Sequence, residues 1–385
     1  MNARHGRIAR ALAIILGLVA LVGGTSPASS AHASSTPDVA QELQLALERY
    51  VANHPTVPGA VLRVEAPQIG LSWEDARGRF AFGEDRPLEP SDAFRTASVT
   101  KTFTAAAVLR LSEQGDLALG DPIAAYLPNK LVRRIAVIDH RSYGRLITIR
   151  QLLNHTSGVY DYAIDPGWRD EVLADPHRTW RPRELVHVAI RGGDPYFRPG
   201  RGFHYSDTGY VLLGLIVRRI TGLPLAGAYR ELLPISELGL DDTYLEGREP
   251  APAGSNERAH QYIDEIDTTQ WNPSFDNFGG GGLVSTAADL DIFMRALFEG
   301  RVLTGPKALD AMLRVSRHAN YALGLFRDHE VDRRAWNHTG FFGSFMYFVP
   351  SLDLSFAGSV NQANAPSVGL VRSVIRIVDD AEAGR

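Results

Sequence analysis

The sequence predicts an α/β protein of the α+β type, in which an antiparallel sheet is built from both ends of the chain and a helical lobe is inserted between them. Strand-like segments lie early, at Ala60–Glu65, and late, between Tyr321 and Val360. Residues 116–276 instead alternate short helical stretches with loops rich in proline, glycine and aromatic side chains. Consecutive short strands favour antiparallel pairing, so we expect one sheet flanked by N- and C-terminal helices.

The first elements follow from local signals. A helix is predicted to begin at Thr36-Pro37-Asp38, because a cap residue, a proline in the first turn and an early acid are typical of a helix N-terminus. Strands are expected at Ala60–Glu65 and at Phe80–Gly83 with its upstream segment. The next helix is expected to start near Ser98, where a polar start runs into an alanine- and leucine-rich stretch.

The last third of the chain predicts the rest of the sheet. Ser285–Asp289 has a capping pattern before a helix, and we interpret the glycine run before it, 279–282, as a flexible loop or hinge. An amphipathic helix is expected from Ser367 to about Ala381. The expected late strands are Tyr321–Phe326, Ala335–Thr339, Ser344–Val349 and Leu354–Val360.

These elements predict two lobes in the mature chain. Residues 34–115 and 277–385 are expected to form the sheet domain, and 116–276 the mostly helical lobe. A cleft between the two lobes is the expected site.

Residues 1–33 have the pattern of a signal peptide. Three arginines precede an apolar run at 11–22, and Ala31-His32-Ala33 offers a cleavage site. The run is short for a membrane span, and there is no twin-arginine pair, so we expect general secretory export, cleavage near Ala33 and no stable membrane insertion afterwards. An uncleaved anchor is the alternative.

Composition excludes several classes of function. The 385-residue chain has net charge −4, and removal of three arginines leaves 37 basic and 44 acidic side chains, or −7. This argues against nucleic acid as the main partner. The chain has no cysteine and its twelve histidines are scattered, so we expect neither disulfides nor a metal site. It contains no P-loop, no His-Glu-x-x-His, no Gly-x-Ser-x-Gly elbow and no dinucleotide fingerprint, and no cofactor is implied.

Ser98-Val99-Thr100-Lys101 is the first candidate catalytic element. Residues three apart lie on one face of a helix, so Ser98 and Lys101 should be neighbours. A serine hydroxyl becomes a strong nucleophile when a base takes its proton, and a buried lysine at a helix N-terminus can be that base. The same helix end supplies N–H groups for an oxyanion. A capped helix with a surface lysine is the alternative.

Two further elements complete the candidate site. Tyr205-Ser206-Asp207 ends a Pro/Gly-rich loop, and a phenol beside a lysine can have a depressed pKa and shuttle a proton. Asp207 could equally be the N-cap of the following helix, Tyr210–Ile220. In Trp336-Asn337-His338-Thr339-Gly340, a strand ends at a glycine that lets a substrate approach.

In this order, the three elements resemble the penicillin-recognising serine hydrolases: D-alanyl-D-alanine carboxypeptidases, class C β-lactamases and their esterase and D-aminopeptidase relatives. The matching motifs are Ser98-Val99-Thr100-Lys101, Tyr205-Ser206-Asp207 and His338-Thr339-Gly340, with further matches at 152–158 and 281–286. The resemblance covers about 39–377, looks closest to the secreted D,D-carboxypeptidases and implies a β-lactamase/transpeptidase-like fold.

The resemblance implies a role for each motif residue. Ser98 is the acylated nucleophile, Lys101 its base partner and Tyr205 the proton shuttle to the leaving amine. Backbone N–H groups of Ser98 and Phe341 would form the oxyanion hole. The substrate-binding residues would be Asp207, His338, Thr339, Gly340, Phe341 and Arg327, of which His338, Thr339 and Arg327 would receive a terminal carboxylate.

The sequence departs from the family pattern twice. Asp207 stands where the family has asparagine; a carboxylate cannot donate a hydrogen bond to a substrate carbonyl, and beside Lys101 it favours the charged amine. Phe341 and Phe342 make the subsite after Gly340 more apolar. We expect an exported serine hydrolase, D-alanyl-D-alanine carboxypeptidase-like, acting on a small peptide, ester or β-lactam. The alternatives are an esterase, β-lactamase or D-aminopeptidase of the same fold, or a catalytically weak penicillin-binding or sensor protein.

Overall fold

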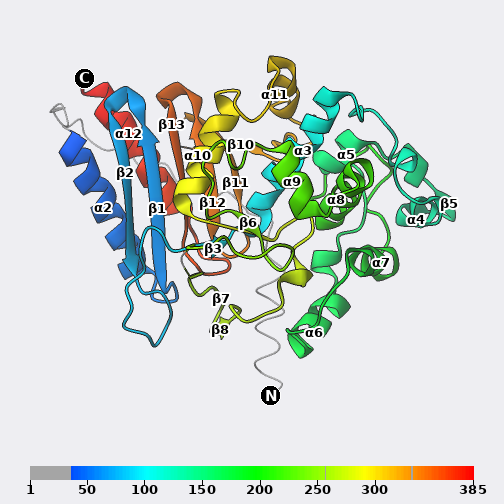
Figure 1. Cartoon of the computed structure of the whole chain (residues 1–385), viewed down its shortest axis with the longest axis horizontal. Coiled ribbons are helices and arrows are strands. Elements are labelled where there is room, and N and C mark those ends of the chain that lie inside the picture. The colour runs from blue at the N-terminus through cyan, green and yellow to red at the C-terminus, as the bar shows by residue number, and fades with distance from the viewer. Residues whose placement is uncertain (1–35, 256, 331–332) are drawn as a thin grey trace.

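The computed structural model describes residues 36–255, 257–330 and 333–385, so the expected signal peptide lies outside the described residues. A six-stranded antiparallel sheet occupies one side of the molecule, in the order β10-β11-β12-β13-β1-β2 (Figure 1). The strands are β1 (Gly59–Ala66), β2 (Leu71–Gly78), β10 (Phe326–Glu330), β11 (Arg333–Thr339), β12 (Ser344–Val349) and β13 (Leu354–Ser359). Early and late strands meet where Val61 pairs with Ser359, which confirms the predicted sheet.

Two strand predictions are wrong in detail. The second strand is the upstream segment, Leu71–Gly78, whereas Phe80–Gly83 turns away from β1. At the other end, 321–325 is a turn closed by the Ala322 N–H donating to the Leu325 carbonyl, and β10 begins only at Phe326. In both cases buried apolar side chains lie in a turn, Phe80 and Ala81 in the first segment and 321–325 in the second, and apolar patterning alone does not distinguish such a turn from a strand.

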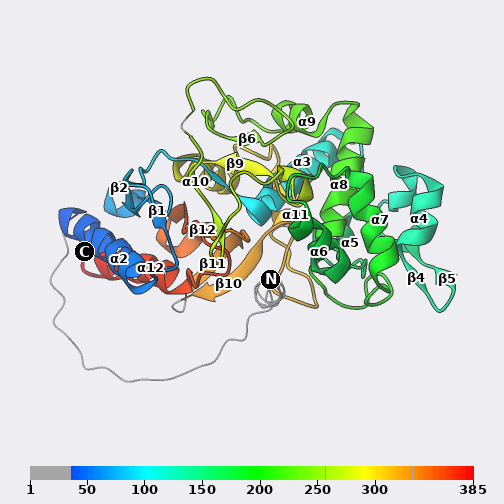
Figure 2. The same cartoon turned by 90° about the horizontal axis from the view of Figure 1, so that it is seen from below.

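Helices cover both faces of the sheet. α2 (Thr36–Asn53) and α12 (Val368–Ala383) pack together on one face, and α10 (Ala287–Phe298) packs on the other (Figures 1 and 2). α2 buries an apolar stripe at helical spacing, formed by Val39, Leu43 and Leu47. The N-cap of α10 is Thr286, whose hydroxyl accepts the Asp289 N–H at 3.2 Å, as the capping pattern predicts.

The helical lobe lies beside the sheet and is built around a buried helix. This helix, α3 (Thr100–Gln114), contacts α8 (Asp207–Thr221) and α9 (Leu225–Leu232), and its small residues 105–107 are fully buried. Small side chains allow the close approach of neighbouring helices. The other helices of this lobe are α4 (Asn129–Ile135), α5 (Ile149–Leu153), α6 (Pro166–Ala174) and α7 (Pro182–Gly192).

A small sheet joins the two halves just before the serine. Its order is β3 (Phe94–Arg95), β9 (Leu283–Ser285) and β6 (Tyr244–Leu245). The chain leaves β3 and enters the single-turn helix η2 (Ala97–Val99), which leads into α3. Short hairpins, β4 (Val137–Ile138) with β5 (Arg141–Ser142) and β7 (Tyr262–Ile263) with β8 (Ile266–Asp267), and the helix α11 (Pro306–Met312) complete the described elements.

Within the described chain, no single helix has the length and apolar character needed to cross a membrane. The pair α8 and α9, bent by 72°, satisfies those criteria together on length and composition alone.

Candidate active site

A cavity of about 490 Å³ opens where the end of the large sheet meets the helical lobe. Ser98 lines it, together with residues of the segment 161–173, the loop 203–207, the segment 263–276 and the turn after β11. The walls are mainly aromatic and aliphatic, and carboxylates line the cavity at Asp161, Asp207 and Asp276. The predicted cleft therefore exists and contains the predicted serine.

Ser98 and Lys101 lie together as the helical spacing predicts. Lys101, in the first turn of α3, is fully buried and its Nζ donates to Ser98 Oγ at 2.8 Å and to the Gly280 carbonyl at 2.7 Å. Ala97, just before the serine, has φ +45°, a left-handed conformation that is costly for a residue with a side chain. The serine is thus presented on a strained turn.

Asp207 is the third partner of the lysine. Its Oδ1 lies 2.5 Å from Lys101 Nζ, in ion-pair contact without the alignment of a good hydrogen bond. The alternative in which Asp207 caps α8 is wrong: Ser206 occupies the N-cap position and Asp207 is the first helical residue. The carboxylate is turned toward Lys101 because an ammonium buried among protein oxygens requires an opposite charge.

Tyr205 completes the contacts around the serine. Its hydroxyl hydrogen-bonds to Ser98, and its ring centroid lies 4.9 Å from Lys101 Nζ. Burial first, and then the Asp207 charge, raise the pKa of Tyr205 well above its usual value. The expected depressed pKa is therefore wrong, because burial and then the Asp207 charge favour the neutral phenol. Tyr205 is a neutral phenol that can donate a proton.

His155 supports Tyr205 from behind and was not predicted. It is 1% exposed, its ring centroid lies 4.2 Å from that of Tyr205, and its Nδ1 accepts the Ser206 N–H at 3.1 Å. Burial and the nearby Lys101 charge lower the pKa of His155 well below its usual value, so the ring is neutral. The position lies in the segment 152–158 matched by the resemblance, but a local motif gives no indication of a partner fifty residues away.

Asp161 and Asp276 bring two more carboxyl groups to the cleft. Asp161 accepts the Asp207 N–H at 2.9 Å, and burial together with the Asp207 charge raises its pKa well above the usual range. Burial and then Asp207 raise the pKa of Asp276 to about 7. The local sequence gives little indication of this role for either residue, because only the tertiary fold brings the two carboxyl groups close to Asp207.

The end of β11 approaches the serine through Gly340. A Cβ on Gly340 would lie 2.2 Å from the Thr96 carbonyl and 2.1 Å from Ser344 Oγ, so only glycine fits. Phe341 and Phe342 follow and line the cleft, and Thr339 is exposed. Among the hydrogen bonds of the described residues, neither the Ser98 nor the Phe341 backbone N–H donates to a protein carbonyl. Both can serve an oxyanion.

His338 and Arg327 are placed away from the cavity lining. His338 is 1% exposed, its Nε2 lies 3.1 Å from the Tyr321 hydroxyl and its Nδ1 lies 2.8 Å from the Thr339 carbonyl. Burial lowers the pKa of His338 to about 3. Arg327, on β10, pairs across the sheet with Trp336. In this structure, neither presents a charge to the cleft.

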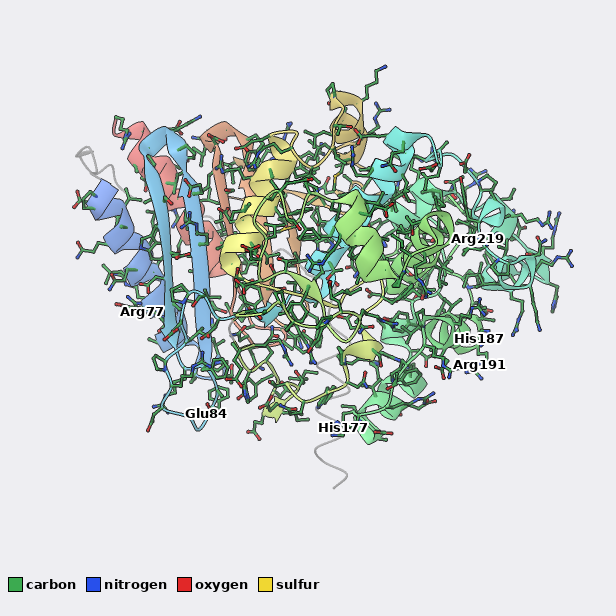
Figure 3. The ribbon with its side chains drawn as sticks, viewed as in Figure 1. Arg77, Glu84, His177, His187, Arg191 and Arg219 are labelled. Atoms are coloured by element: carbon green, nitrogen blue, oxygen red, sulfur yellow. The ribbon has the colours of Figure 1, made fainter. Side chains whose placement is uncertain are left out.

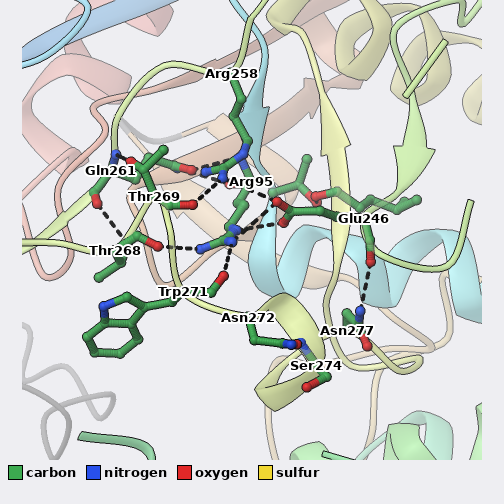
Figure 4. Close-up of polar contacts among 12 residues, drawn as sticks. Arg95, Glu246, Arg258, Gln261, Thr268, Thr269, Trp271, Asn272, Ser274 and Asn277 are labelled. Atoms are coloured by element: carbon green, nitrogen blue, oxygen red, sulfur yellow. Dashed lines mark hydrogen bonds and ion pairs between the residues drawn. The ribbon is translucent and has the colours of Figure 1, made fainter. Parts of the chain in front are cut away.

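A buried polar cluster fixes one wall of the cleft (Figure 4). Arg95, on β3, pairs with Glu246 at 2.6 Å and donates to the carbonyls of Thr268 and Trp271, each at 2.8 Å. Arg258 adds a bond to the Thr269 carbonyl at 2.6 Å. The segment that carries Trp271 and Asp276 is thereby attached to the strand that leads into Ser98.

The glycine run at 279–282 is a packed segment, which corrects its interpretation as a flexible loop or hinge. All four residues are buried, and a Cβ on Gly279 would lie 2.3 Å from the Tyr210 carbonyl. A Cβ on Gly281 would lie 2.2 Å from Asp276 Oδ2. The glycines therefore allow the backbone to pass close to Lys101 and to Asp276.

Some of the histidines outside the cleft are exposed to solvent. His177 and His187 are exposed on the helical lobe, and Figure 3 shows both at its lower border, with Arg191 beside His187. Among the described residues, no group of three or more histidine, aspartate or glutamate side chains has an arrangement that could hold a metal ion.

The chain matches known proteins over most of its length. The model of the Beta-lactamase family matches residues 47–378. Penicillin-binding protein 4* of Bacillus subtilis is 30% identical over 254 residues, 63% of this chain and 52% of that protein. Penicillin-binding protein 4 of Amycolatopsis lactamdurans is 32% identical over 263 residues, 66% of this chain and 63% of that protein. The chain thus aligns with about half to two thirds of these relatives.

Solved structures are similar over nearly their full length. A D-stereospecific amidohydrolase from Streptomyces sp. is 32% identical, with a TM-score of 0.74, over 86% of this chain and 97% of that one. The D-amino acid amidase of Ochrobactrum anthropi SV3, in complex with L-phenylalanine amide, is 25% identical, with a TM-score of 0.74, over 89% of this chain and 99% of that one.

Proposed function

This chain belongs to the Beta-lactamase family, and on that premise we propose that it is an exported serine hydrolase that forms an acyl-enzyme on Ser98. The observation that carries the proposal is the contact of Ser98 Oγ with the buried Lys101 Nζ at 2.8 Å, in a cavity of about 490 Å³. A serine and a buried amine in hydrogen-bond contact form an activated nucleophile.

The chemistry proceeds in two steps. Ser98 Oγ bonds to the substrate carbonyl carbon, and its proton passes to the Lys101 amine in its uncharged form, while the Ser98 and Phe341 N–H groups hold the oxyanion. Tyr205 then protonates the leaving amine or alcohol as the bond from that group to the carbonyl carbon breaks, and Lys101 passes the proton it took from Ser98 to the Tyr205 oxygen. Water releases the acyl group by the reverse proton path.

Small amides and esters are the best-supported substrates. The cleft walls are apolar, and His338 and Arg327, the residues expected to bind a carboxylate, present no charge to it. The similar D-stereospecific amidohydrolase supports an amidase over a carboxypeptidase. D-alanyl-D-alanine carboxypeptidase activity is the second candidate, and Arg169 in the cleft wall favours it, since a guanidinium binds a substrate carboxylate well.

The experiment is intact-mass measurement of the mature protein after brief exposure to a penicillin and, separately, to a nitrophenyl ester, with Ser98→Ala as control. An adduct or rapid turnover that is absent from the Ser98→Ala protein is expected. The absence of both adduct and turnover with either reagent would contradict the proposal. D-alanine release from a D-Ala-D-Ala peptide would favour the second candidate. Export predicts a mature N-terminus near Ser34, to be read by N-terminal sequencing of the protein outside the cytoplasm.

A further inference from the structure

The cleft holds more carboxylate than the acyl-transfer chemistry requires. We propose that Asp276, with Asp207, binds a substrate ammonium group, so that the preferred substrates are small amides or esters whose acyl part carries a free amine. The inference rests on the proposed function of the same site, because it concerns the group attached to the carbonyl that Ser98 attacks.

Asp276 has a carboxylate that the protein itself does not use. It follows the single-turn helix η6 (Pro273–Phe275) and lines the cavity. Among the described residues, none forms a hydrogen bond or an ion pair with its side chain. Its carboxyl group lies against Gly281, where a Cβ would be 2.2 Å from Oδ2. The glycine therefore provides space for an acid that lines the cavity, where its partly exposed carboxylate is accessible to a ligand.

The other two acids of the cleft are already accounted for. The Asp207 charge is balanced by Lys101 at 2.5 Å, and Asp161 is buried and already accepts the N–H groups of Ala163 and Asp207. Asp276 is thus the carboxyl group whose charge is not balanced by a contact. A cation entering beside Asp207 and Asp276 would stabilise the ionised form of Asp276 and be held by it in turn.

The walls fit the rest of such a ligand. Trp168, Trp271, Phe275 and Phe341 line the same cavity, and aromatic faces attract ammonium groups as well as apolar side chains. A substrate carboxylate in this part of the cleft would face the unbalanced carboxyl group of Asp276. Arg169, on α6, is the permanently cationic side chain among the described residues that line the cavity. Arg169 therefore favours an anionic group on its side of the cavity, whereas Asp276, beside Asp207, favours a positive group.

The experiment compares matched substrates on the full protein. The p-nitroanilide and the nitrophenyl ester of phenylalanine, each as both enantiomers, are assayed in four forms: free amine, N-methyl, N-acetyl and N-succinyl. The N-methyl form adds bulk and keeps the charge, the N-acetyl form removes the charge, and the N-succinyl form reverses it. The variants are Asp276→Asn and, as a matched control, Asp310→Asn at an exposed position on α11.

We expect kcat/KM at least tenfold higher for the free-amine and N-methyl forms than for the N-acetyl form, with the N-succinyl form slowest. Asp276→Asn should lower kcat/KM at least tenfold more for the cationic forms than for the N-acetyl form, and Asp310→Asn should change neither. Equal or better turnover of the N-acetyl or N-succinyl form would overturn the inference while leaving the hydrolase standing, as would an equal loss on every substrate. If no ester or β-lactam acylates Ser98, the proposed function fails first.

Discussion

At the residue scale, the site is organised by the environment of one buried ammonium. Lys101 contacts the hydroxyl of Ser98, the carbonyl of Gly280 and the carboxylate of Asp207, and no part of it is exposed to solvent. Removing a charge from water is costly unless it is paired and hydrogen-bonded, and these three oxygens meet that requirement. The same arrangement stabilises the charged amine, which opposes its action as a base toward Ser98.

Replacing Asp207 by asparagine should therefore speed acylation by neutral amides and β-lactams. Asparagine removes the charge that holds the Lys101 proton, and it adds an N–H that can donate to a substrate carbonyl. We expect the acylation rate for a penicillin or an N-acetyl anilide to rise about tenfold, measured by stopped-flow or intact mass. Asp310→Asn, on the exposed face of α11, is the control. A slower Asp207→Asn protein would show that the carboxylate assists the lysine.

Removal of the Tyr205 hydroxyl should affect amides more than activated esters. The pKa of Tyr205 is raised by burial and by Asp207, so the phenol carries its proton at neutral pH and can pass it to a leaving amine. For Tyr205→Phe, we expect kcat to fall about 100-fold or more on anilides and less than tenfold on nitrophenyl esters, whose leaving group needs no proton. An equal loss on both substrates would indicate that the hydroxyl activates Ser98. Circular dichroism at matched concentration controls for folding.

At the scale of elements, the end of β11 is held against the turn that carries Ser98. This close approach requires glycine at position 340, because a Cβ there would have no room between the Thr96 carbonyl and Ser344 Oγ. The Ser344 hydroxyl donates to that same carbonyl at 2.7 Å, which ties β12 to the turn as well. The position of the Phe341 N–H relative to Ser98 thus depends on one close backbone contact.

Gly340→Ala should separate the strand end from the serine. A methyl group 2.2 Å from a backbone carbonyl must move one of the two segments, so we expect acylation of Ser98 to fall at least 100-fold and the unfolding free energy to fall by about 1–3 kcal/mol. The measurements are intact-mass acylation kinetics and urea denaturation. Gly369→Ala on α12, where a Cβ meets open space, is the matched control; it should leave acylation unchanged and, by helix propensity, raise the unfolding free energy by up to about 1 kcal/mol. Unchanged acylation in Gly340→Ala would separate the strand end from catalysis.

At the scale of the whole molecule, the sequence predicted the architecture better than the site. Helix signals such as Thr36-Pro37-Asp38 and the strand at Leu354–Ser359 are local, and the structure has both. The Ser98–Lys101 contact was predictable for the same reason, since helix geometry alone brings the two together. Asp161 and Asp276 reach Asp207 from distant segments, and no local pattern encodes that convergence.

The same limitation explains the errors. Asp207 was open to interpretation as a helix cap because the buried ammonium that attracts it lies a hundred residues earlier. The glycine run looked flexible because the backbone and carboxyl groups packed against it are remote in sequence or belong to a turn. Local propensity predicts elements, whereas long-range electrostatics and packing determine what a residue does within them.

Buried acids should also make the stability of the whole molecule depend on pH. Asp291, on α10, is packed against the sheet with its Oδ1 buried and without a hydrogen-bond partner; Arg63 on β1 approaches only to 3.9 Å. Burial raises the pKa of Asp291 to about 7, although Ser355, Arg63 and Arg295 oppose this and Glu65 adds to it. The folded protein binds this proton more tightly than the unfolded chain does. The contribution of the protonated Asp291 to the unfolding free energy is therefore complete below pH 4 and is lost as the pH rises toward 7.

Asp291→Asn should remove that part of the pH dependence. Urea denaturation from pH 4 to 8 is expected to show the unfolding free energy of the parent falling relative to Asp291→Asn by about 2–4 kcal/mol, with most of the change between pH 4 and 7. Burial also raises the pKa of Asp276 to about 7 and that of Asp289 to about 6, so the parent curve contains all three acids, and only the difference curve isolates Asp291. The curve of unfolding free energy against pH for Asp310→Asn, at an exposed position on α11, should run parallel to that of the parent. If Asp291→Asn runs parallel as well, Arg63 and Ser355 hold the ionised carboxylate in the folded state, and α10 lies on the sheet without an electrostatic cost.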